Sequence, residues 1–226
     1  MISVIAQAPK TRERGRQQRR LSATRTKLLN AARTVFAERG LDLTRIDDIT
    51  DRADVGKGTF YYHFNGKDEL VNELIKTVLG ELSAVIEERC AGKTDLTALL
   101  DTLISAHIEF FCTRWEDFVL YFQGRTDLTL QQSYAGIETP FIEYLKRVEN
   151  LLASVIKHRL AQPELRRIAC AVAGFVSGYY SFAVISQTEN ENIDETFRSL
   201  RGAMVGSLTR FIQEAVESAE RTRGVK

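Results

Sequence analysis

The sequence has little of what β-rich or disulfide-bonded proteins need. Its 226 residues include only three prolines and 14 glycines, too few for the frequent turns of an all-β fold. The three cysteines, Cys90, Cys112 and Cys170, are odd in number and widely spaced, which fits reduced thiols better than a disulfide framework. Leu, Ala, Glu and Arg dominate the composition, and we therefore expect a nearly all-helical protein.

Long apolar runs are also lacking. No segment approaches eighteen consecutive apolar residues, and residues 1–8 lack the basic start and the long apolar stretch of a secretory signal. With 44% hydrophobic and 27% charged residues, the composition is that of an ordinary globular protein. We expect a soluble, cytoplasmic chain that has a sizeable core and no membrane partner.

The positive charge gathers at one end. Residues 1–67 hold 14 Lys and Arg against 7 Asp and Glu, while residues 68–226 hold 17 against 23. A basic head on an acidic body suggests that the head meets a polyanion. Residues 1–21 are the most basic part, with Glu13 as their single acid, and are predicted to be a flexible arm. This arm either adds phosphate or minor-groove contacts or is a solvating tail.

Residues 22–66 are predicted to form a helix-turn-helix unit. Ser22 is an N-cap candidate, Gly40 a C-terminal stop, and Thr44 with Asp47 resembles a capping box. Apolar spacing then predicts a long first helix and two short ones, over residues 22–39, 45–53 and 57–64, with a turn at 54–56. Two short helices packed under a longer one match the tri-helical form of this motif, whose second short helix enters the major groove of DNA.

The second short helix has two distinct sides. Phe60 and Phe64, four residues apart, form its buried edge, which leaves Tyr61 and Tyr62 on the outer arc. Tyrosine hydroxyls donate hydrogen bonds to phosphate oxygens, and their rings pack on sugars. Gly58 costs about 1 kcal/mol of helix propensity, and close approach of the backbone to a phosphate is a plausible compensation.

The stretch from Thr24 to Leu74, with RADVGKGTFYYHF at its centre and KDEL following, resembles the DNA-binding domain of the TetR family of transcriptional repressors. The resemblance implies an all-helical homodimer of about nine helices per subunit, which binds a palindromic operator and is released by a small molecule. It implies DNA contacts at Arg45, Val55, Gly56, Lys57, Gly58, Thr59, Tyr61, Tyr62, His63 and Lys67. The chain departs from the common family pattern at Arg45, Asp54 and Gly56, where Thr, Gly and Ser are usual.

Residues 67–226 are predicted to be a helical bundle for ligand binding and dimerisation. We expect a long helix over 67–89 and further helices over 95–114, 115–124, 139–160, 163–187 and 193–220, with irregular chain between 124 and 136. Aromatic residues concentrate in its middle. They either form plain core or line a pocket for an aromatic or amphipathic effector, for which the candidates are His107, Phe111, Trp115, Phe118, Phe122, Phe141, Tyr144 and Tyr179. Gln123 and Arg114 are further groups that could orient a ligand.

Glycines in the last two helices indicate close helix packing. Gly174, Gly178, Gly202 and Gly206 lie mid-helix, at a summed cost of about 3 to 4 kcal/mol in helix propensity. A two-fold interface between subunits would offset this cost, and the family resemblance also places its dimer interface on these helices. The alternatives are close packing within one subunit or room for a ligand beside Tyr179.

Other chemistry has little support in the sequence. His107 and Glu109 lie on different faces of a helix, and His63 and His158 are far apart, so we expect no metal site. Nucleophile, phosphate-loop and dinucleotide motifs are absent, and we expect neither a cofactor nor an enzyme. Two alternatives stay open: a DNA-binding regulator that senses oxidants through Cys112 or Cys170, and a helical enzyme.

Overall fold

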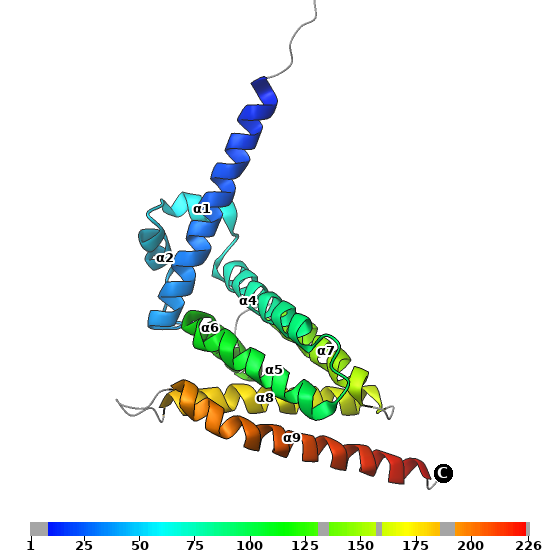
Figure 1. Cartoon of the computed structure of the whole chain (residues 1–226). Coiled ribbons are helices and arrows are strands. Elements are labelled where there is room, and N and C mark those ends of the chain that lie inside the picture. The colour runs from blue at the N-terminus through cyan, green and yellow to red at the C-terminus, as the bar shows by residue number, and fades with distance from the viewer. Residues whose placement is uncertain (1–8, 131–135, 157–159, 186–192, 225–226) are drawn as a thin grey trace, which may run out of the picture.

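The computed structural model describes residues 9–130, 136–156, 160–185 and 193–224, and every regular element in these ranges is an α-helix (Figure 1). This confirms the all-helical prediction. The helices are α1 (Pro9–Arg39), α2 (Ile46–Ala53), α3 (Lys57–His63), α4 (Lys67–Cys90), α5 (Leu96–Cys112), α6 (Trp115–Leu130), α7 (Glu138–Val155), α8 (Gln162–Ile185) and α9 (Ile193–Gly224).

The C-terminal half of α1 packs on α2, and α2 packs on α3, which gives the predicted three-helix unit. Its core consists of side chains that are at most 1% exposed: Leu28, Ala32, Phe36, Ile49, Phe60 and Phe64. The stop predicted at Gly40 is also present. Gly40 has a φ of +85°, and its N–H donates to the carbonyl oxygen of Phe36 at 2.8 Å, which is the left-handed geometry that glycine supplies at helix ends.

The first helix begins earlier than the sequence suggested. Residues 9–21, predicted to be an arm without regular structure, form the first turns of α1, and Ser22 lies within the helix. The carbonyl of Ser22 accepts a helical back-bond from the Thr26 hydroxyl at 3.0 Å. The prediction of an irregular arm was wrong because high charge does not oppose helix formation where arginine and glutamine, both good helix formers, dominate. Pro9 begins the helix where its missing N–H costs nothing.

Two further boundary predictions were wrong. The N–H of Arg45 is capped by the Asp48 carboxylate at 2.9 Å, one residue after the expected Asp47, while the Thr44 hydroxyl donates to the carbonyl of Gly40 at 2.7 Å. Helix α6 continues through Gly124, which was expected to end it. A Cβ on Gly124 would lie 2.6 Å from Ile75 Cδ1, so this glycine allows α4 and α6 to approach closely.

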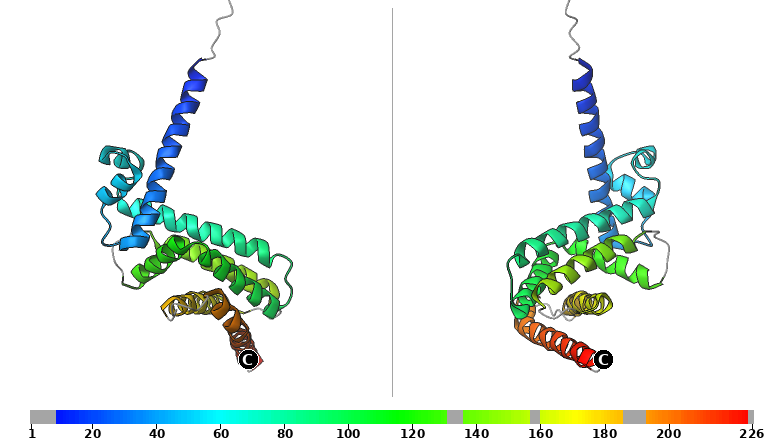
Figure 2. Two further views of the ribbon diagram at one scale, coloured as in Figure 1. Left: turned by 60° about the vertical axis from the view of Figure 1, so that its left-hand side comes forward. Right: turned by 90° about the vertical axis from the view of Figure 1, so that its right-hand side faces the viewer.

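Helices α4 to α9 form the body. Helix α4 leads from the three-helix unit into the body, where it packs against α5, α6 and α7, while α8 and α9 cover the end farthest from α3 (Figure 1, Figure 2). The buried apolar residues form one cluster that runs from Leu28 in α1 to Ile212 in α9. Among the described residues, no single helix is long and apolar enough to span a membrane; one pair, α5 with the start of α6, meets the length and composition test but is bent by 110°.

Candidate functional site

The turn between α2 and α3 has the geometry that its sequence predicts. Asp54 adopts a left-handed conformation with φ 53° and ψ 54°, and it ends α2. Its N–H donates to the carbonyl of Asp51 at 3.2 Å, and the next N–H, that of Val55, donates to Thr50 at 3.0 Å. Aspartate tolerates this region better than most residues, which explains how Asp54 stands where the family commonly has glycine.

Helix α3 is fixed by one edge and exposed along the other. Phe60 is 0% and Phe64 1% exposed, with ring centroids 5.6 Å apart. Tyr61 and Tyr62 lie on the open side, with 51% and 67% of their surface exposed. Large aromatic side chains are rarely left in water without a partner. The exposed face of α3 is therefore the strongest candidate for a binding surface in this part of the molecule.

The backbone at the start of α3 is equally open. Gly56 and Gly58 are exposed, and a Cβ placed on either would meet no atom within 4 Å. The chain's own packing therefore does not require glycine at these two positions. Among the other predicted DNA contacts, Arg45 and Lys57 are exposed, whereas Val55, Thr59, His63 and Lys67 are partly buried.

Two of the predicted cations already have partners. Lys57 Nζ lies 2.7 Å from Asp47 Oδ1, and this contact raises the pKa of Lys57. Lys67 Nζ donates to the carbonyl oxygens of Leu41 and Thr44 at 2.8 and 3.1 Å. Lys67 therefore anchors the loop after α1 to the start of α4. A DNA contact by Lys67 stays a prediction.

His63 contributes to this face without a positive charge. Burial, and after it the charge of Arg25, lowers the pKa of His63, so its ring is neutral at pH 7. Its Nε2 is buried and has no hydrogen-bond partner among the described residues, while the ring packs edge-on against Tyr62 with centroids 5.1 Å apart. His63 thus supports the orientation of Tyr62.

Five of the eight effector candidates lie inside the body: His107, Phe111, Phe118, Phe141 and Tyr144. Burial lowers the pKa of His107 to about 4. Its Nδ1 lies 2.7 Å from the carbonyl oxygen of Leu103 and its Nε2 lies 2.6 Å from the hydroxyl oxygen of Tyr144. Because a carbonyl only accepts, the neutral ring donates from Nδ1 and accepts the Tyr144 hydroxyl proton at Nε2.

The buried rings are continuous with two exposed ones. Trp115 and Phe122 are 47% and 40% exposed, and each contacts Phe118. From Phe118 the ring contacts continue inward through Phe111 and Tyr121, with centroids 5.3 to 5.5 Å apart, and on to Phe141 and Tyr144. The eighth candidate, Tyr179, belongs to α8, but its side chain lies outside the described residues.

The sequence did not reveal how the body meets the three-helix unit. Asp117 on α6 is nearly fully buried; Arg33 Nε on α1 lies 2.9 Å from its Oδ1, and Arg114 Nη1 lies 3.7 Å from its Oδ2. Burial raises the pKa of Asp117, and the two arginines offset part of that rise. Arg114 also pairs with Glu81 on α4. Asp117 was missed because nothing in the local sequence distinguishes it from a surface acid near a helix start.

Gln123, considered above as a ligand-orienting group, belongs to the same junction. Its Oε1 accepts the N–H of Leu41, just after α1, at 3.0 Å. Arg114, the other such group, stacks on the Phe110 ring at 4.6 Å in addition to its two ion pairs. Both side chains therefore hold helices together in this structure, and neither is placed at the His107–Tyr144 pair.

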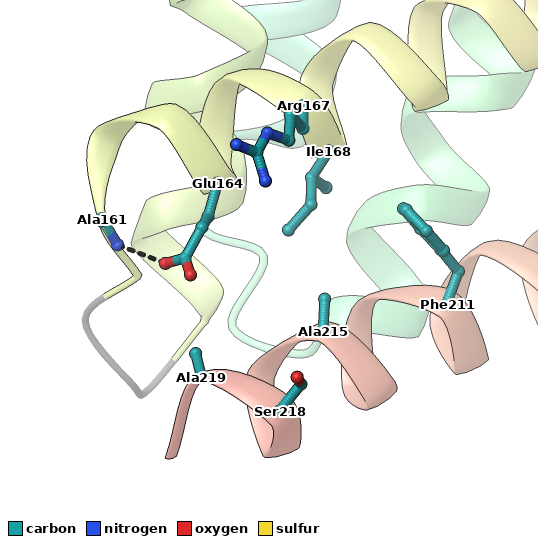
Figure 3. Close-up of a pocket in the computed structure, with 8 residues that line it drawn as sticks. All are labelled: Ala161, Glu164, Arg167, Ile168, Phe211, Ala215, Ser218 and Ala219. Atoms are coloured by element: carbon teal, nitrogen blue, oxygen red, sulfur yellow. Dashed lines mark hydrogen bonds between the residues drawn. The ribbon is translucent and has the colours of Figure 1, made fainter. Parts of the chain in front are cut away.

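The four glycines of α8 and α9 face open space. A Cβ built on Gly174, Gly178, Gly202 or Gly206 meets no atom within 4 Å. Close packing inside the subunit therefore does not explain them. Phe175 on α8 and Phe211 on α9 are 41% and 44% exposed, and Phe211 lines a groove of about 410 Å³ between the two helices (Figure 3).

Groups for other chemistry are few. Among the described residues, no cluster of three or more His, Cys, Asp and Glu side chains is placed to hold a metal ion. Cys90 is buried, Cys112 half-buried and Cys170 exposed. Burial raises the pKa of the Cys90 thiol, which disfavours the reactive thiolate.

Comparison with known proteins finds similarity over the three-helix unit. Residues 28–74 match the family model described as bacterial regulatory proteins, tetR family. This segment runs from Leu28 in α1, through α2 and α3, to the first two turns of α4. The HTH-type transcriptional repressor KstR2 of Rhodococcus jostii is 39% identical over 88 residues, which are 39% of this chain and 43% of that protein. The matched segment thus spans less than half the length of this relative.

Solved structures extend the likeness to the whole fold. FadR of Bacillus subtilis, in complex with stearoyl-CoA, superposes with a TM-score of 0.63 at 21% identity, covering 81% of this chain and 96% of that one. The ketosteroid transcriptional regulator KstR2 of Mycobacterium tuberculosis gives 0.59 at 23% identity, covering 81% and 93%. At such identities the likeness establishes the fold alone.

Proposed function

We propose that this chain, whose residues 28–74 match the model of the tetR family of bacterial regulatory proteins, is a DNA-binding regulator of that family rather than an enzyme, and that it represses transcription as a homodimer. In this proposal the dimer binds a palindromic operator and leaves it when an amphipathic organic molecule binds in the body. The observation that carries the proposal is the exposed face of α3, where Tyr61 and Tyr62 project while Phe60 and Phe64 fix the helix from behind.

The geometry of this face suits the major groove. The groove is about 12 Å wide and admits one α-helix. Lys57 and the open backbone at Gly56 and Gly58 stand at the N-terminal end of α3, the end that reaches base edges in this motif. The two tyrosines lie one turn further along, where their hydroxyls are placed for phosphate oxygens.

A second subunit accounts for the open glycines. If α8 and α9 pack against their two-fold mates, Gly174 and Gly206 let the backbones approach, and Phe175 and Phe211 become buried. The dimer then presents two copies of α3. In helix-turn-helix dimers, the two recognition helices lie about 34 to 36 Å apart, which is one turn of the DNA.

The buried cluster supports an amphipathic effector. Phe111, Phe118 and Phe141 offer an apolar surface, and the His107–Tyr144 pair offers a polar end. One of the two similar structures is a complex with stearoyl-CoA, and the other is described as a ketosteroid transcriptional regulator. A fatty acyl thioester and a ketosteroid each join a large apolar part to polar groups. Because the rings contact one another in this structure, an effector has to separate them.

Separation of the rings would move α6. Phe118 and Asp117 are neighbours on that helix, one in the ring cluster and the other in the ion pair with Arg33 of α1. We propose that this displaced arrangement binds the operator less well. An effector that favours it then lowers operator affinity, and operator DNA lowers effector affinity by the same factor.

The first test is selection of a binding site from a random duplex library with the purified protein, followed by titration of the selected DNA over a salt series. We expect an inverted repeat and a steep loss of affinity with salt, about 0.9 log units per log unit of salt for each phosphate contacted. Failure to recover any site, or a slope near zero, would contradict operator binding.

The second test adds effectors to the protein bound to that selected DNA. Stearoyl-CoA and a ketosteroid are compared with free coenzyme A, which has no acyl chain. We expect one of the two amphipathic compounds to release the DNA and coenzyme A alone to leave it bound. Tyr144→Phe should raise the concentration needed for half-release, because the Tyr144 hydroxyl is lost from the polar end. Release by none of the compounds, or by an oxidant alone, would contradict the proposed effector class.

A further inference from the structure

The first turns of α1 stand clear of the rest of the molecule. Figure 1 and Figure 2 show them rising past α2 and α3, away from α8 and α9. From residue 15 of α1 onward, the first side chain that is fully buried is Leu28, and the first that binds another helix is Arg25, which pairs with Glu73 of α4. Residues 9–21, here called the extension, are thus helical without packing support from the body, and they are about 20 Å long at 1.5 Å per residue.

The described part of the extension carries exposed positive charge. Arg16, Arg19 and Arg20 are exposed, and among the described residues no ion pair holds any of them. Most arginines and lysines of the three-helix unit differ, since a carboxylate lies beside each of Arg25, Arg33, Arg39, Arg52 and Lys57. Free cations therefore gather on the extension, where they are available to an external anion.

Four of the six basic residues of the extension share one side of the helix. At 100° per residue, positions 12, 16, 19 and 20 fall together with Lys27 within an arc of about 100°, whereas Lys10 and Arg14 fall on the opposite side. Leu28, Ala32 and Phe36, which belong to the buried core, also fall on the opposite side. The basic stripe thus runs along the solvent face of α1 toward the end of the molecule that bears α3.

We infer that the extension is a second DNA-contacting element, whose basic stripe binds the phosphates of the duplex beyond the half-site read by α3. This inference rests on the proposed operator binding, which places a duplex at this end of the molecule. A helix with its side chains is about 10 to 12 Å across, whereas the minor groove is about 6 Å wide. The helical extension therefore lies against the sugar-phosphate backbone and does not thread the minor groove as a flexible arm would.

The length of the extension determines how many base pairs it can contact. A rod of about 20 Å covers at most about six base pairs at 3.4 Å each. It also predicts contacts with no base preference, because phosphates carry no sequence information. The binding site of the dimer should therefore include about six base pairs of any sequence on each side of the palindrome.

The test compares two duplexes that share the selected palindrome, one ending at its edges and one with ten further base pairs of random sequence on each side. The full-length protein is titrated with both, beside Arg16→Gln/Arg19→Gln/Arg20→Gln and a control, Lys76→Gln/Lys93→Gln/Lys146→Gln. The control removes the same charge from exposed positions of the body. A further variant, Gln17→Pro, keeps every charge but interrupts the rod.

We expect the wild type and the control to prefer the flanked duplex by at least tenfold, and the triple arginine variant to bind both duplexes equally. The salt slope on the flanked duplex should fall by up to about 5 in the arginine variant, since three arginines are lost from each subunit of a dimer. Gln17→Pro should lose most of the preference. Equal binding of both duplexes by the wild type, or an unchanged preference in either the arginine variant or Gln17→Pro, would overturn the inference. Operator binding itself fails only if the short palindrome is not bound.

Discussion

Arg33 on α1 lies 2.9 Å from Asp117 on α6, and this pair joins the three-helix unit to the body at a nearly fully buried carboxylate. Gln123, two turns further along α6, accepts the N–H of Leu41 beside it. Helix α6 also carries Phe118, a member of the ring cluster. The same helix thus contacts the end of α1 and the proposed effector site, which makes α6 a direct physical connection between the two.

Asp117→Asn should weaken this connection without weakening the fold. Burial raises the pKa of Asp117, so the folded state disfavours the ionised carboxylate relative to the unfolded chain. The protonated Asp117 therefore stabilises the fold, and this stability is lost as pH rises through the folded pKa. A neutral isostere at pH 7 should therefore leave the free energy of unfolding unchanged or raise it, as measured in urea. The ratio of operator affinities without and with effector, typically 5- to 150-fold in coupled systems, should fall toward one.

The matched control is Glu87→Gln, which breaks an ion pair with Arg147 between two helices of the body. This exposed pair joins α4 to α7, so its loss should change stability by less than about 1 kcal/mol and leave the coupling ratio intact. An unchanged ratio in Asp117→Asn, or equal loss in both variants, would show that the Arg33–Asp117 pair does not transmit the effector signal.

His107 should make the stability of the body dependent on pH. Its pKa is about 4 in the folded protein and about 6.5 in an unfolded chain. As pH falls from 7 toward 4, the unfolded chain takes up a proton that the folded protein does not, so the free energy of unfolding decreases by about 3 kcal/mol. His107→Gln lacks this group. Its urea-derived stability should be lower than that of the wild type at pH 7, and the difference should shrink toward pH 4.5. Parallel curves for the two proteins would contradict a buried neutral histidine.

The sequence predicted those parts of the fold that local chemistry decides. The Phe60 and Phe64 edge and the turn at residues 54–56 follow from spacing and residue type alone. The helix expected from residue 95 is also present as α5, where Asp95 accepts from the N–H of Ala98 at 2.8 Å. Each involves residues only a few positions apart. For the same reason the exposure of Tyr61 and Tyr62 was predictable before the fold was known.

The sequence predictions that failed concern features that depend on tertiary packing. Gly124 suggests a helix end in sequence, but its role is to admit Ile75 of α4, 49 residues away. Asp117 gives no sign of its burial under Arg33. Within the effector candidates, spacing did not separate the buried Phe118 from the exposed Trp115 and Phe122, because which face of α6 is covered depends on where α1 and α4 pack.

Tyr62→Ala should reduce operator affinity with little effect on folding. The side chain is 67% exposed and belongs to no core, so the melting temperature should change by only a degree or two, as for most surface substitutions. Loss of its phosphate and sugar contacts should cost about 1 to 3 kcal/mol of binding, which is about 5- to 150-fold in affinity. Ile142→Ala, a control on α7 with similar exposure, should bind the operator as the wild type does. Wild-type affinity in Tyr62→Ala would remove this side chain from the DNA interface.

Gly206→Leu should separate the subunits without harming either one. A Cβ at Gly206 meets no atom of its own chain within 4 Å, and leucine has the higher helix propensity by somewhat less than 1 kcal/mol, so the isolated subunit should be at least as stable. In a two-fold interface, however, the side chain would be introduced twice into a close backbone contact. Gly80→Leu is the matched control, because Gly80 is also exposed, mid-helix and open. Sedimentation velocity should show a monomer for Gly206→Leu and a dimer for Gly80→Leu, and only the former should lose its preference for a full palindrome over a half-site. A dimer in both variants would place the subunit interface away from this stretch of α9.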